Sequence, residues 1–544
     1  MNSLKMNYKS YFGKDFVALC FFDRINSGVK VTACLCSEQE NASLRYQISN
    51  QDIEADFYYS CKKNVEGRVV NFNYFIINLT KEQMQDGTAI SFESIPLAAF
   101  SKFPIDIRSL SYFFFDEYVL YLDNRCVCVS LKENAPLKKI KKNHRRAMRA
   151  CFKTDKKNVI KASVIRLAHN ICSPFFKKDI WLVADRKDLG GDNGEAFFEY
   201  LASQKLENKS VYFVINKSSC HLARIKKLGK VLHPRSFKYK LYYTFATRLI
   251  ASQLEYDIVN PIFADGYLKD ILHKCKVVFL QHGIIKDDLS KTYNRYERPL
   301  DIFVTSTVDE YNSIAKSNDY GYGEGIVKLT GLARYDKLTS GQEKIIFICP
   351  SWRKYCLKDT ETKEPVDGIE KTPAYVFYNS LLSNKKLIDK ATATGYKICF
   401  YPHHMIEKCF ESIDLTNPVF INHKGISYKE MFCRGSLLMT DYSSVQFDFA
   451  YLKKPVVYCQ PDKEEFFASH TYIQGYFDYE RDGFGQVCYE PQALVSLLCD
   501  YMDNGCTLQN VYRERIEKTF KFNDQENCKR ILDEVINLDN ENNY

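Results

Sequence analysis

The segment LLMTDYSSVQFDFAYLKKPVVY, residues 437–458, indicates the fold class. An apolar run leads into a Thr-Asp-Tyr-Ser-Ser turn, a short helical segment follows, and Lys-Lys-Pro introduces a second apolar run, which is the pattern of a βαβ unit. Ser and Asp are preferred at helix starts, where free amides attract phosphate. The stretch therefore predicts a site for a phosphate-sized anion. The alternative is that Ser443 and Ser444 only cap the helix and that Asp448 is an ordinary helix carboxylate.

Three more apolar runs each deliver a polar side chain: His282 follows VVFLQ, Arg353 follows IIFICPSW, and His403 follows YKICFYP. These runs indicate buried parallel strands, and ligands of open α/β sheets bind outside the carboxyl ends of the strands. Imidazole is the natural proton acceptor at neutral pH, and the planar guanidinium of Arg suits phosphate oxygens. For His282 the alternative is a buried, hydrogen-bonded structural histidine.

Several motifs in a fixed order are far more specific than any one of them. The chain resembles the CDP-glycerol glycerophosphotransferase family, which includes the poly(glycerol-phosphate) and poly(ribitol-phosphate) polymerases of teichoic acid and capsule synthesis. The resemblance covers roughly residues 175 to 535 and rests on the segments WLVADRKDLGGDNGEAFFEYL (181–201), QHGIIKDDLS (281–290), TGLARYDKL (330–338), PSWR (350–353), FYPHH (400–404) and TDYSSVQFDFAYLKKPVVY (440–458).

Two of these motifs differ from the common family pattern. Family members often have His-Pro at the third strand end, where this chain has Pro402, His403 and His404. The glycerol-phosphate enzymes commonly have HGTPLK, where this chain has HGIIKD from His282 onward. The polyol of the donor, glycerol or ribitol, therefore stays open at this point.

The order of predicted elements indicates the architecture. Residues 1–136 alternate short apolar runs with polar breaks, whereas the later chain alternates strands with helix-length segments, the signature of parallel α/β layers. The predicted fold class is α/β, with two Rossmann-like domains in a glycosyltransferase-B arrangement, preceded by a β-rich N-terminal domain. We expect a hinge near Gly331 and Gly341. The expected divisions are a β-rich accessory domain (1–136), basic linker helices (137–174), an acceptor domain (175–337) and a CDP-polyol donor domain (338–544).

The resemblance implies a transferase that moves a polyol phosphate from a CDP-activated donor to a hydroxyl of a growing, lipid-linked polymer and releases CMP. It implies a proton-accepting role for His282 and places His403 beside the donor phosphates. The donor-binding residues it implies are Arg353, Thr440, Asp441, Ser443, Ser444 and Asp448. The alternative for Asp448 is a salt bridge between its helix and a loop. The sequence requires no cofactor and no dedicated metal.

Three other functions compete with this one. Nucleotide-sugar transferases share the glycosyltransferase-B fold, so architecture alone does not separate them. A non-catalytic scaffold that binds a lipid-linked glycan is a second alternative, against which intact His282 and Arg353 argue. Nucleic-acid binding has little support, because 67 acidic residues balance 76 basic ones and no nucleic-acid module is present.

Charge and cysteine usage bear on where the protein works. Between Lys138 and Lys157 stand ten basic residues and one acid, Asp155, and apolar residues recur there at near-helical spacing: Leu137, Ile140, Met148, Cys151 and Phe152. A basic amphipathic helix suits an anionic membrane surface; the alternative is a solvated linker helix. The twenty cysteines form no Cys-x-x-Cys pair, and no signal-peptide or membrane-spanning run is present. We therefore expect a cytoplasmic protein, peripheral on the inner face of the cell membrane.

Overall fold

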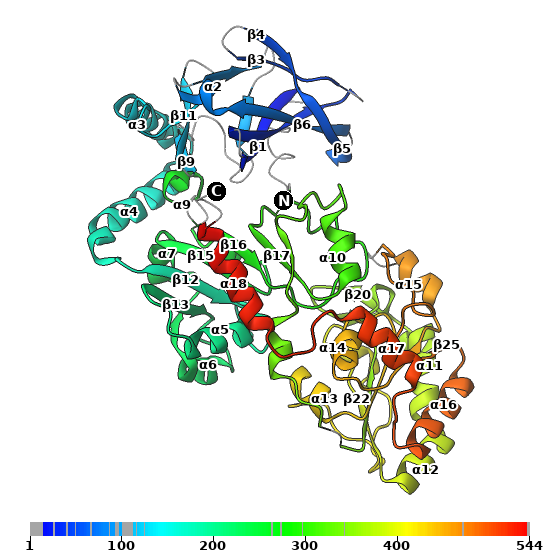
Figure 1. Cartoon of the computed structure of the whole chain (residues 1–544). Helices are drawn as coiled ribbons and strands as arrows, with labels where there is room; N and C mark the ends of the chain where they lie inside the picture. The colour runs from blue at the N-terminus through cyan, green and yellow to red at the C-terminus, as the bar shows by residue number, and fades with distance from the viewer. Residues whose placement is uncertain are drawn as a thin grey trace.

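The chain folds into a β-rich part, two long helices and two α/β parts (Figure 1). The computed structural model describes residues 15–540 apart from 26–27, 40–41, 49–50, 66–67, 86–87, 93–96, 101–111, 116, 124–125, 263–264, 273–274, 296–297, 342 and 470–472. No helix in these described ranges has an apolar run long enough to span a bilayer. The cysteines that the structure describes are free thiols, most of them buried.

The β-rich part consists of two mainly antiparallel sheets that share one apolar core. The first has the order β5-β6-β2-β1-β8 and comprises β1 (Phe16–Ile25), β2 (Gly28–Ser37), β5 (Asp56–Val65), β6 (Arg68–Thr80) and β8 (Leu97–Phe100). The second has the order β4-β3-β7-β11-β10-β9 and comprises β3 (Arg45–Ile48), β4 (Gln51–Glu54), β7 (Thr88–Ser91), β9 (Tyr112–Phe115), β10 (Tyr118–Asp123) and β11 (Cys126–Leu131). Val31 of the first sheet and Leu120 of the second lie in the same buried cluster, as expected of a sandwich.

Helices α3 (Leu137–Thr154) and α4 (Lys156–Cys172) follow, and they contact each other. The basic helix predicted from the sequence is α3. Its Ile140 is buried against the second β-sheet beside Tyr112, whereas Phe152 is 43% exposed. The side chain of Cys151 lies outside the described part of the chain. The start of α3, with Leu137 and Ile140, is thus attached to the β-rich part.

The first α/β part is built on a seven-stranded parallel sheet of order β14-β13-β12-β15-β16-β17-β18. The strands Asp179–Ala184 and Ile302–Thr305 are buried almost throughout, because helices cover both faces, whereas Lys209–Val214 and Lys230–Leu232 are only partly buried. The strands are β12 (Asp179–Ala184), β13 (Lys209–Val214), β14 (Lys230–Leu232), β15 (Ala246–Ala251), β16 (Lys276–Phe279), β17 (Ile302–Thr305) and β18 (Val327–Leu329). The helices between them include α5 (Asn193–Ser203), α6 (Leu222–Leu228), α7 (Phe237–Tyr243), α8 (Tyr256–Val259), α9 (Lys269–Leu272) and α10 (Val308–Ala315).

The second α/β part has a five-stranded parallel sheet of order β22-β19-β23-β24-β25. The βαβ unit predicted for residues 437–458 is confirmed as β23 (Leu437–Thr440), α14 (Val445–Tyr451) and β24 (Val456–Cys459). The other strands are β19 (Ile345–Cys349), β22 (Lys397–Phe400) and β25 (Val487–Cys488), and the helices include α11 (Pro373–Leu382), α12 (Lys385–Thr394), α13 (Tyr428–Arg434), α15 (Lys463–Ser469), α16 (Pro491–Asp503) and α17 (Asn510–Thr519).

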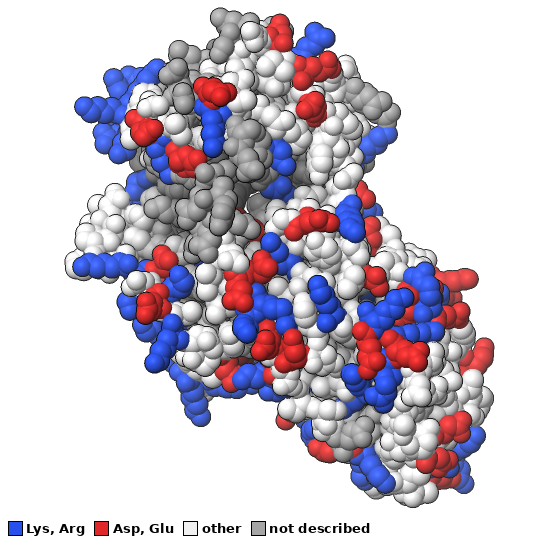
Figure 2. All heavy atoms as spheres, viewed as in Figure 1, with Lys and Arg blue, Asp and Glu red and all other residues white. Residues whose placement is uncertain are grey.

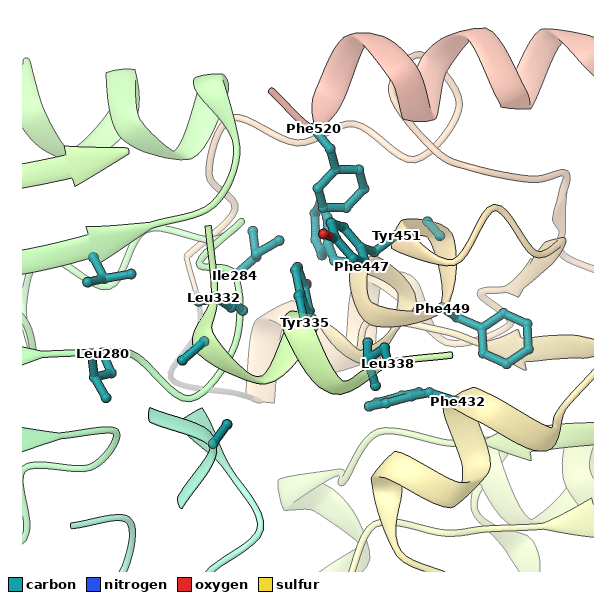
Figure 3. Close-up of a cluster of buried hydrophobic side chains, with 14 of the residues drawn as sticks. Leu280, Ile284, Leu332, Tyr335, Leu338, Phe432, Phe447, Phe449, Tyr451 and Phe520 are labelled. Atoms are coloured by element: carbon teal, nitrogen blue, oxygen red, sulfur yellow. The ribbon is translucent and has the colours of Figure 1, made fainter. Parts of the chain in front are cut away.

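The two α/β parts are joined by a shared core and by the last helix. The short helix η3 (Ala333–Lys337) places Tyr335 on Tyr451 of α14, with ring centroids 4.2 Å apart (Figure 3). Helix α18 (Asn527–Asn540) then returns to the first part, where it contacts α5, η3 and β17. Gly331 has a φ of 84° and leaves room for Asn527 at the start of α18.

Helix α18 is the last helix in the sequence, but it packs on the first α/β part. The proposed boundaries at residues 136, 174 and 337 stay proposals, and the last helix of the 338–544 segment packs on the preceding segment. The predicted fold class is confirmed: two parallel α/β sheets in a glycosyltransferase-B arrangement follow a β-rich, mainly antiparallel N-terminal part.

Candidate functional site

The loop after β16 carries His282, and buried polar groups fix its backbone by hydrogen bonds. Gln281 has a left-handed φ of 62°, its side-chain amide donates to the Val304 carbonyl and to Glu310, and its carbonyl accepts from Asn193 Nδ2 at 2.8 Å. Glu310 also accepts from the Ile285 amide at 2.7 Å, and burial raises its pKa to about 7. These contacts fix the backbone on both sides of His282 while its side chain remains 55% exposed.

His282 forms a pair with Asp192, the residue that caps the start of α5. Nδ1 of the imidazole contacts Asp192 Oδ2. Burial would raise the pKa of Asp192, but the neighbouring His282 and Arg334 outweigh it and lower that pKa to about 2. An ionised carboxylate can only accept, so Nδ1 carries the hydrogen of this bond. Nε2 is then the nitrogen that can take a proton from an incoming hydroxyl.

A second carboxylate holds the loop that bears Asp192. Asp185 follows β12 directly and accepts from the amides of Asp192 at 3.1 Å and Gly194 at 2.7 Å, and from the Ser252 hydroxyl at 2.7 Å. Burial, together with the nearby charge of Asp192, raises the pKa of Asp185. A Cβ on Gly194 would lie only 2.3 Å from the Ala184 carbonyl oxygen, which explains the glycine there. The α5 start is therefore a fixed support for the His282–Asp192 pair.

Arg334 links this pair to the second α/β part. Its guanidinium donates to both oxygens of Asp448 at 2.6 and 2.9 Å, to Asp192 Oδ1 at 2.7 Å, and to the His282 carbonyl. Asp448 was predicted either to bind the donor or to form a salt bridge with a loop. It has 1% exposure and forms the salt bridge, with Arg334 of η3 as the partner. The chain His282–Asp192–Arg334–Asp448 thus joins both parts at the site.

The predicted anion-binding turn lies against the His282 loop. Ser443 and Ser444 are half-buried, and the Ser443 hydroxyl accepts from the Val445 amide at 3.3 Å. A Cβ on Gly283 would lie 3.1 Å from Ser444 Oγ, so the backbone beside His282 and the start of α14 approach each other closely. Two motifs 161 residues apart, at 283 and 444, are therefore brought together at the facing edges of the two sheets.

Arg353 occupies a different environment from the one predicted. Its side chain is 0% exposed and pairs with Asp441 and with Asp462, whose Oδ2 is 3.0 Å from Nε. Asp441 also accepts from the Ser351 amide at 2.9 Å and the Tyr378 hydroxyl at 2.9 Å. The Arg353 guanidinium therefore has no exposed surface for a donor phosphate. Its positive charge is already balanced by the two buried carboxylates.

Thr440 and Asp441, also predicted as donor-binding residues, are buried at 0% exposure. The Thr440 hydroxyl donates to the Cys349 carbonyl at 2.7 Å, and Asp441 accepts from the Tyr442 amide at 2.6 Å. Their contacts shape the turn between β23 and α14 from the inside. Ser443 and Ser444 are the residues of this turn that keep accessible surface.

His403 lies at the end of β22, where its amide donates to the Pro350 carbonyl at 3.2 Å. Burial, followed by the charges of His404 and Arg186, lowers its pKa to about 3, so the ring is neutral at pH 7. Nδ1 accepts from the Met405 amide at 3.3 Å, which leaves the hydrogen on Nε2. His403 is therefore a neutral ring with a hydrogen-bond donor at Nε2, whereas the sequence-based expectation had it offset the charge of the donor; its contact with a phosphate stays a prediction.

Arg186 was missed by the sequence reasoning. It follows Asp185 at the carboxyl end of β12, is half-buried, and forms no side-chain hydrogen bond or ion pair with any residue that the structure describes. Its charge contributes to the lowered pKa of His403 and also of His404, whose shift comes first from burial. Among the described residues, the Arg186 guanidinium of the first α/β part thus has no carboxylate partner, and its charge acts on histidines of the second α/β part.

Asp192 and Arg334 were also missed as site residues, although both lie in segments that carried the family resemblance. The signal available for Asp192 was an Asp-Asn-Gly helix start directly after a buried strand and turn. Arg334 had no comparable signal. Among the described residues, no group of three or more His, Cys, Asp or Glu side chains is arranged to hold a metal ion.

Comparison with solved structures places this geometry on a known fold. The structure of the wall teichoic acid polymerase TagF superposes with a TM-score of 0.52, covering 74% of this chain and 98% of that chain at 16% sequence identity. At this identity the likeness concerns the fold alone.

Comparison of sequences identifies the family. The minor teichoic acid biosynthesis protein GgaB of Bacillus subtilis (strain 168) is 36% identical over 394 residues, 71% of this chain and 43% of that protein. A teichoic acid poly(glycerol phosphate) polymerase of Bacillus spizizenii (strain ATCC 23059 / NRRL B-14472 / W23) is 25% identical over 203 residues, 36% of this chain and 41% of that protein. The chain thus spans less than half the length of these curated relatives. The family model for CDP-glycerol:poly(glycerophosphate) glycerophosphotransferases matches residues 165–537, and the chain belongs to that family.

Proposed function

We propose that this chain transfers a polyol phosphate, glycerol phosphate in the first instance, from a CDP-linked donor to a hydroxyl of a growing polymer and releases CMP. The observation that carries the proposal is the His282–Asp192 pair, with Nε2 of the imidazole directed away from the carboxylate and available to a hydroxyl. Membership of the glycerophosphotransferase family supports the choice of donor.

In the proposed reaction His282 acts as the general base. Nε2 takes the proton of the acceptor hydroxyl as its oxygen attacks the phosphorus that bears the polyol. A bond forms between the acceptor oxygen and this phosphorus, the bond from phosphorus to the bridging oxygen breaks, and CMP leaves with that oxygen. Asp192 holds the ring and balances the positive charge that forms on it. Positioning and charge stabilisation account for the rate, without a covalent intermediate.

On the donor side we assign the diphosphate to the groups that keep accessible polar surface. These are Ser443 and Ser444 at the turn before α14, His403 through Nε2–H, and Arg186 from the opposite sheet. The fork of Arg186 suits two phosphate oxygens and would offset the charge of the donor. The turn itself is fixed from the protein interior by Thr440, Asp441 and Arg353, which do not contact the donor in this proposal. Asp448 holds Arg334 in place.

The acceptor in this proposal is a lipid-linked glycan or polyol-phosphate chain, reached from the cytoplasmic side of the cell membrane. Support comes from the relatives, whose names place them in teichoic acid synthesis, and from the basic helix α3. The protein would therefore be peripheral on an anionic membrane surface. CDP-ribitol is the alternative donor, because the HGIIKD sequence after Gln281 differs from the common glycerol-phosphate motif.

Release of CMP from defined donors tests the proposal. The purified protein is incubated with an acceptor primer and, in separate reactions, CDP-glycerol, CDP-ribitol and a set of UDP-sugars. CMP from CDP-glycerol, with glycerol phosphate incorporated into the primer, is the expected result. CMP release from CDP-ribitol alone would change the polyol and keep the mechanism. UDP release from a nucleotide sugar, with neither CDP-polyol used, would refute the proposal.

A further inference from the structure

The outer face of α4 carries a continuous stripe of exposed apolar side chains, which we call the α4 stripe. It consists of Ile160 (44% exposed), Val164 (52%), Leu167 (61%) and Ile171 (61%), and Phe175 (82%) continues it after the helix. The spacing of four, three and four residues places the helical members on one face over about 17 Å. Contiguous exposed apolar residues of this kind mark an interaction surface, whereas single ones do not.

The opposite face of α4 already has a packing partner. Val159, Ala162 and Ile165 are buried, and the last two lie in the core cluster with Leu182 of β12 and Tyr239 of α7. Helix α4 is therefore apolar on two sides, and among the residues that the structure describes only one of them is packed in a core. Attachment of α4 to the first α/β part does not require the stripe.

Basic side chains surround the stripe. Lys156 and Lys157 stand at the start of α4, and Lys177 and Lys178 follow Phe175, all of them exposed. Burial and the nearby Lys240 and Lys157 lower the pKa of Lys161. The neighbouring α3 has no acidic residue and exposes Lys138, Lys139, Lys141, Lys142, Arg145, Arg146, Arg149 and Lys153.

These features form one surface at the side of the molecule. Figure 2 shows blue side chains gathered over α3 and a mainly uncharged surface over the adjacent α4. Lysine is depleted in protein–protein interfaces, so a lysine-rich border around an apolar stripe does not favour a protein partner. Anionic lipid headgroups complement the charge, and the acyl region beneath them accepts the apolar side chains of a helix that lies in the membrane plane.

We propose that the α4 stripe and the basic face of α3 together bind an anionic lipid bilayer, with the stripe entering the boundary between headgroups and acyl chains. The proposal deepens the proposed function, because it assigns the surface that would bring the enzyme to a lipid-linked acceptor. It differs from the sequence-based expectation, in which α3 supplied both the charges and the apolar face. Vesicle binding itself needs no transfer chemistry, so the two proposals can fail separately.

Co-sedimentation with vesicles tests the assignment. Wild-type protein should bind vesicles of phosphatidylglycerol and phosphatidylcholine at low salt, and binding should weaken as salt is added. Leu167→Gln/Ile171→Gln should lower the apparent partition coefficient about a hundredfold, since each large apolar side chain contributes about tenfold. The matched control is Val376→Gln/Val511→Gln, which changes two residues exposed at 54% and 49% on α11 and α17, and it should bind like wild type.

Two further measurements show whether the double variant is folded and active. Thermal unfolding and CMP release with a soluble acceptor should be the same for Leu167→Gln/Ile171→Gln and wild type. The assignment is overturned if the double variant binds vesicles as well as wild type, or if wild-type protein stays in the supernatant with anionic vesicles at low salt. It is also overturned if lipid-free wild-type protein sediments as a dimer that the double variant dissociates, because the stripe would then bind a second copy of the chain. If wild-type protein binds vesicles as expected but releases no CMP from any CDP-polyol, that result would instead count against the proposed function.

Discussion

Replacing Asp192 by Asn tests the proposed base directly, because the two side chains have the same shape. Asp192 accepts through Oδ2 from Nδ1 of His282 and through Oδ1 from Arg334, and Asn would place a donor at one of these two positions. The pKa of Asp192 falls from 3.8 to about 2 in the folded protein, so its surroundings favour the ionised form by roughly 2 kcal/mol. The carboxylate is only 14% exposed, so solvent screens this interaction little. His282 and Arg334 share that energy.

The expected loss of rate follows from this energy and from the ring geometry. Without the carboxylate, the positive charge that forms on His282 loses at most roughly 2 kcal/mol of stabilisation, which is a factor of about 30 in rate. The Asn amide can also donate to Nδ1, which would leave the hydrogen on Nε2 and block proton uptake. Together these effects predict that Asp192→Asn lowers kcat by about 10²–10⁴-fold.

The assay is CMP release at saturating acceptor, with the CDP-glycerol concentration varied. The donor concentration for half-maximal rate should stay within about twofold of wild type, because Asp192 is not assigned to the donor. Asp188→Asn is the control, since Asp188 is an exposed carboxylate of the same loop. A variant Asp192→Asn with near wild-type kcat, or one whose defect lies in donor affinity alone, would refute the pairing argument.

Three other substitutions test the roles assigned to Arg353, Arg186 and Glu310. Arg353→Lys should lower the free energy of unfolding by about 3 kcal/mol through loss of its contacts with Asp462, while folded protein keeps its donor affinity; denaturant unfolding and donor titration check both. Arg186→Gln should raise the donor concentration for half-maximal rate about tenfold, unlike the exposed Lys217→Gln, and equal values for the two variants would remove Arg186 from the donor site. The pKa of Glu310 is about 7 against an ordinary 4.5, so its contribution to stability is complete below pH 4.5 and is lost as the pH rises through 7, by up to about 3 kcal/mol. Unfolding at about pH 5 and about pH 8 should show this fall for wild type and not for Glu310→Gln.

The parts of the fold that local patterns specify were predictable. The βαβ unit at residues 437–458 and the strand before His282 are short, fully apolar runs bounded by turn residues, and both were confirmed. The return of α18 to the first sheet was not predictable, because helix periodicity says which face is apolar and not which sheet it covers. The same limit applied to α4, whose two apolar faces give no single amphipathic stripe in sequence.

The position of a residue at the end of a strand was predictable from the sequence. The pairing of two residues far apart in the sequence was not. Asp192 lies 90 residues before His282, and Arg334 lies 142 residues after Asp192. Arg353 was predicted to contact the donor because its strand end suits that role, but Asp462, 109 residues later, neutralises it inside the protein. Burial and pairing over such separations depend on the packing of whole sheets, so the residue type at a strand end cannot distinguish a ligand from a structural ion pair.

CMP release by His282→Ala, measured beside wild type with CDP-glycerol and a suitable acceptor, tests whether His282 is the general base. The variant should fold normally, since His282 is 55% exposed and its loop is held by Gln281 and Glu310. The expected result is a loss of about 10²–10⁴-fold in rate with the thermal unfolding of wild type. A folded His282→Ala variant that releases CMP at a near wild-type rate would contradict the assignment of His282 as the base.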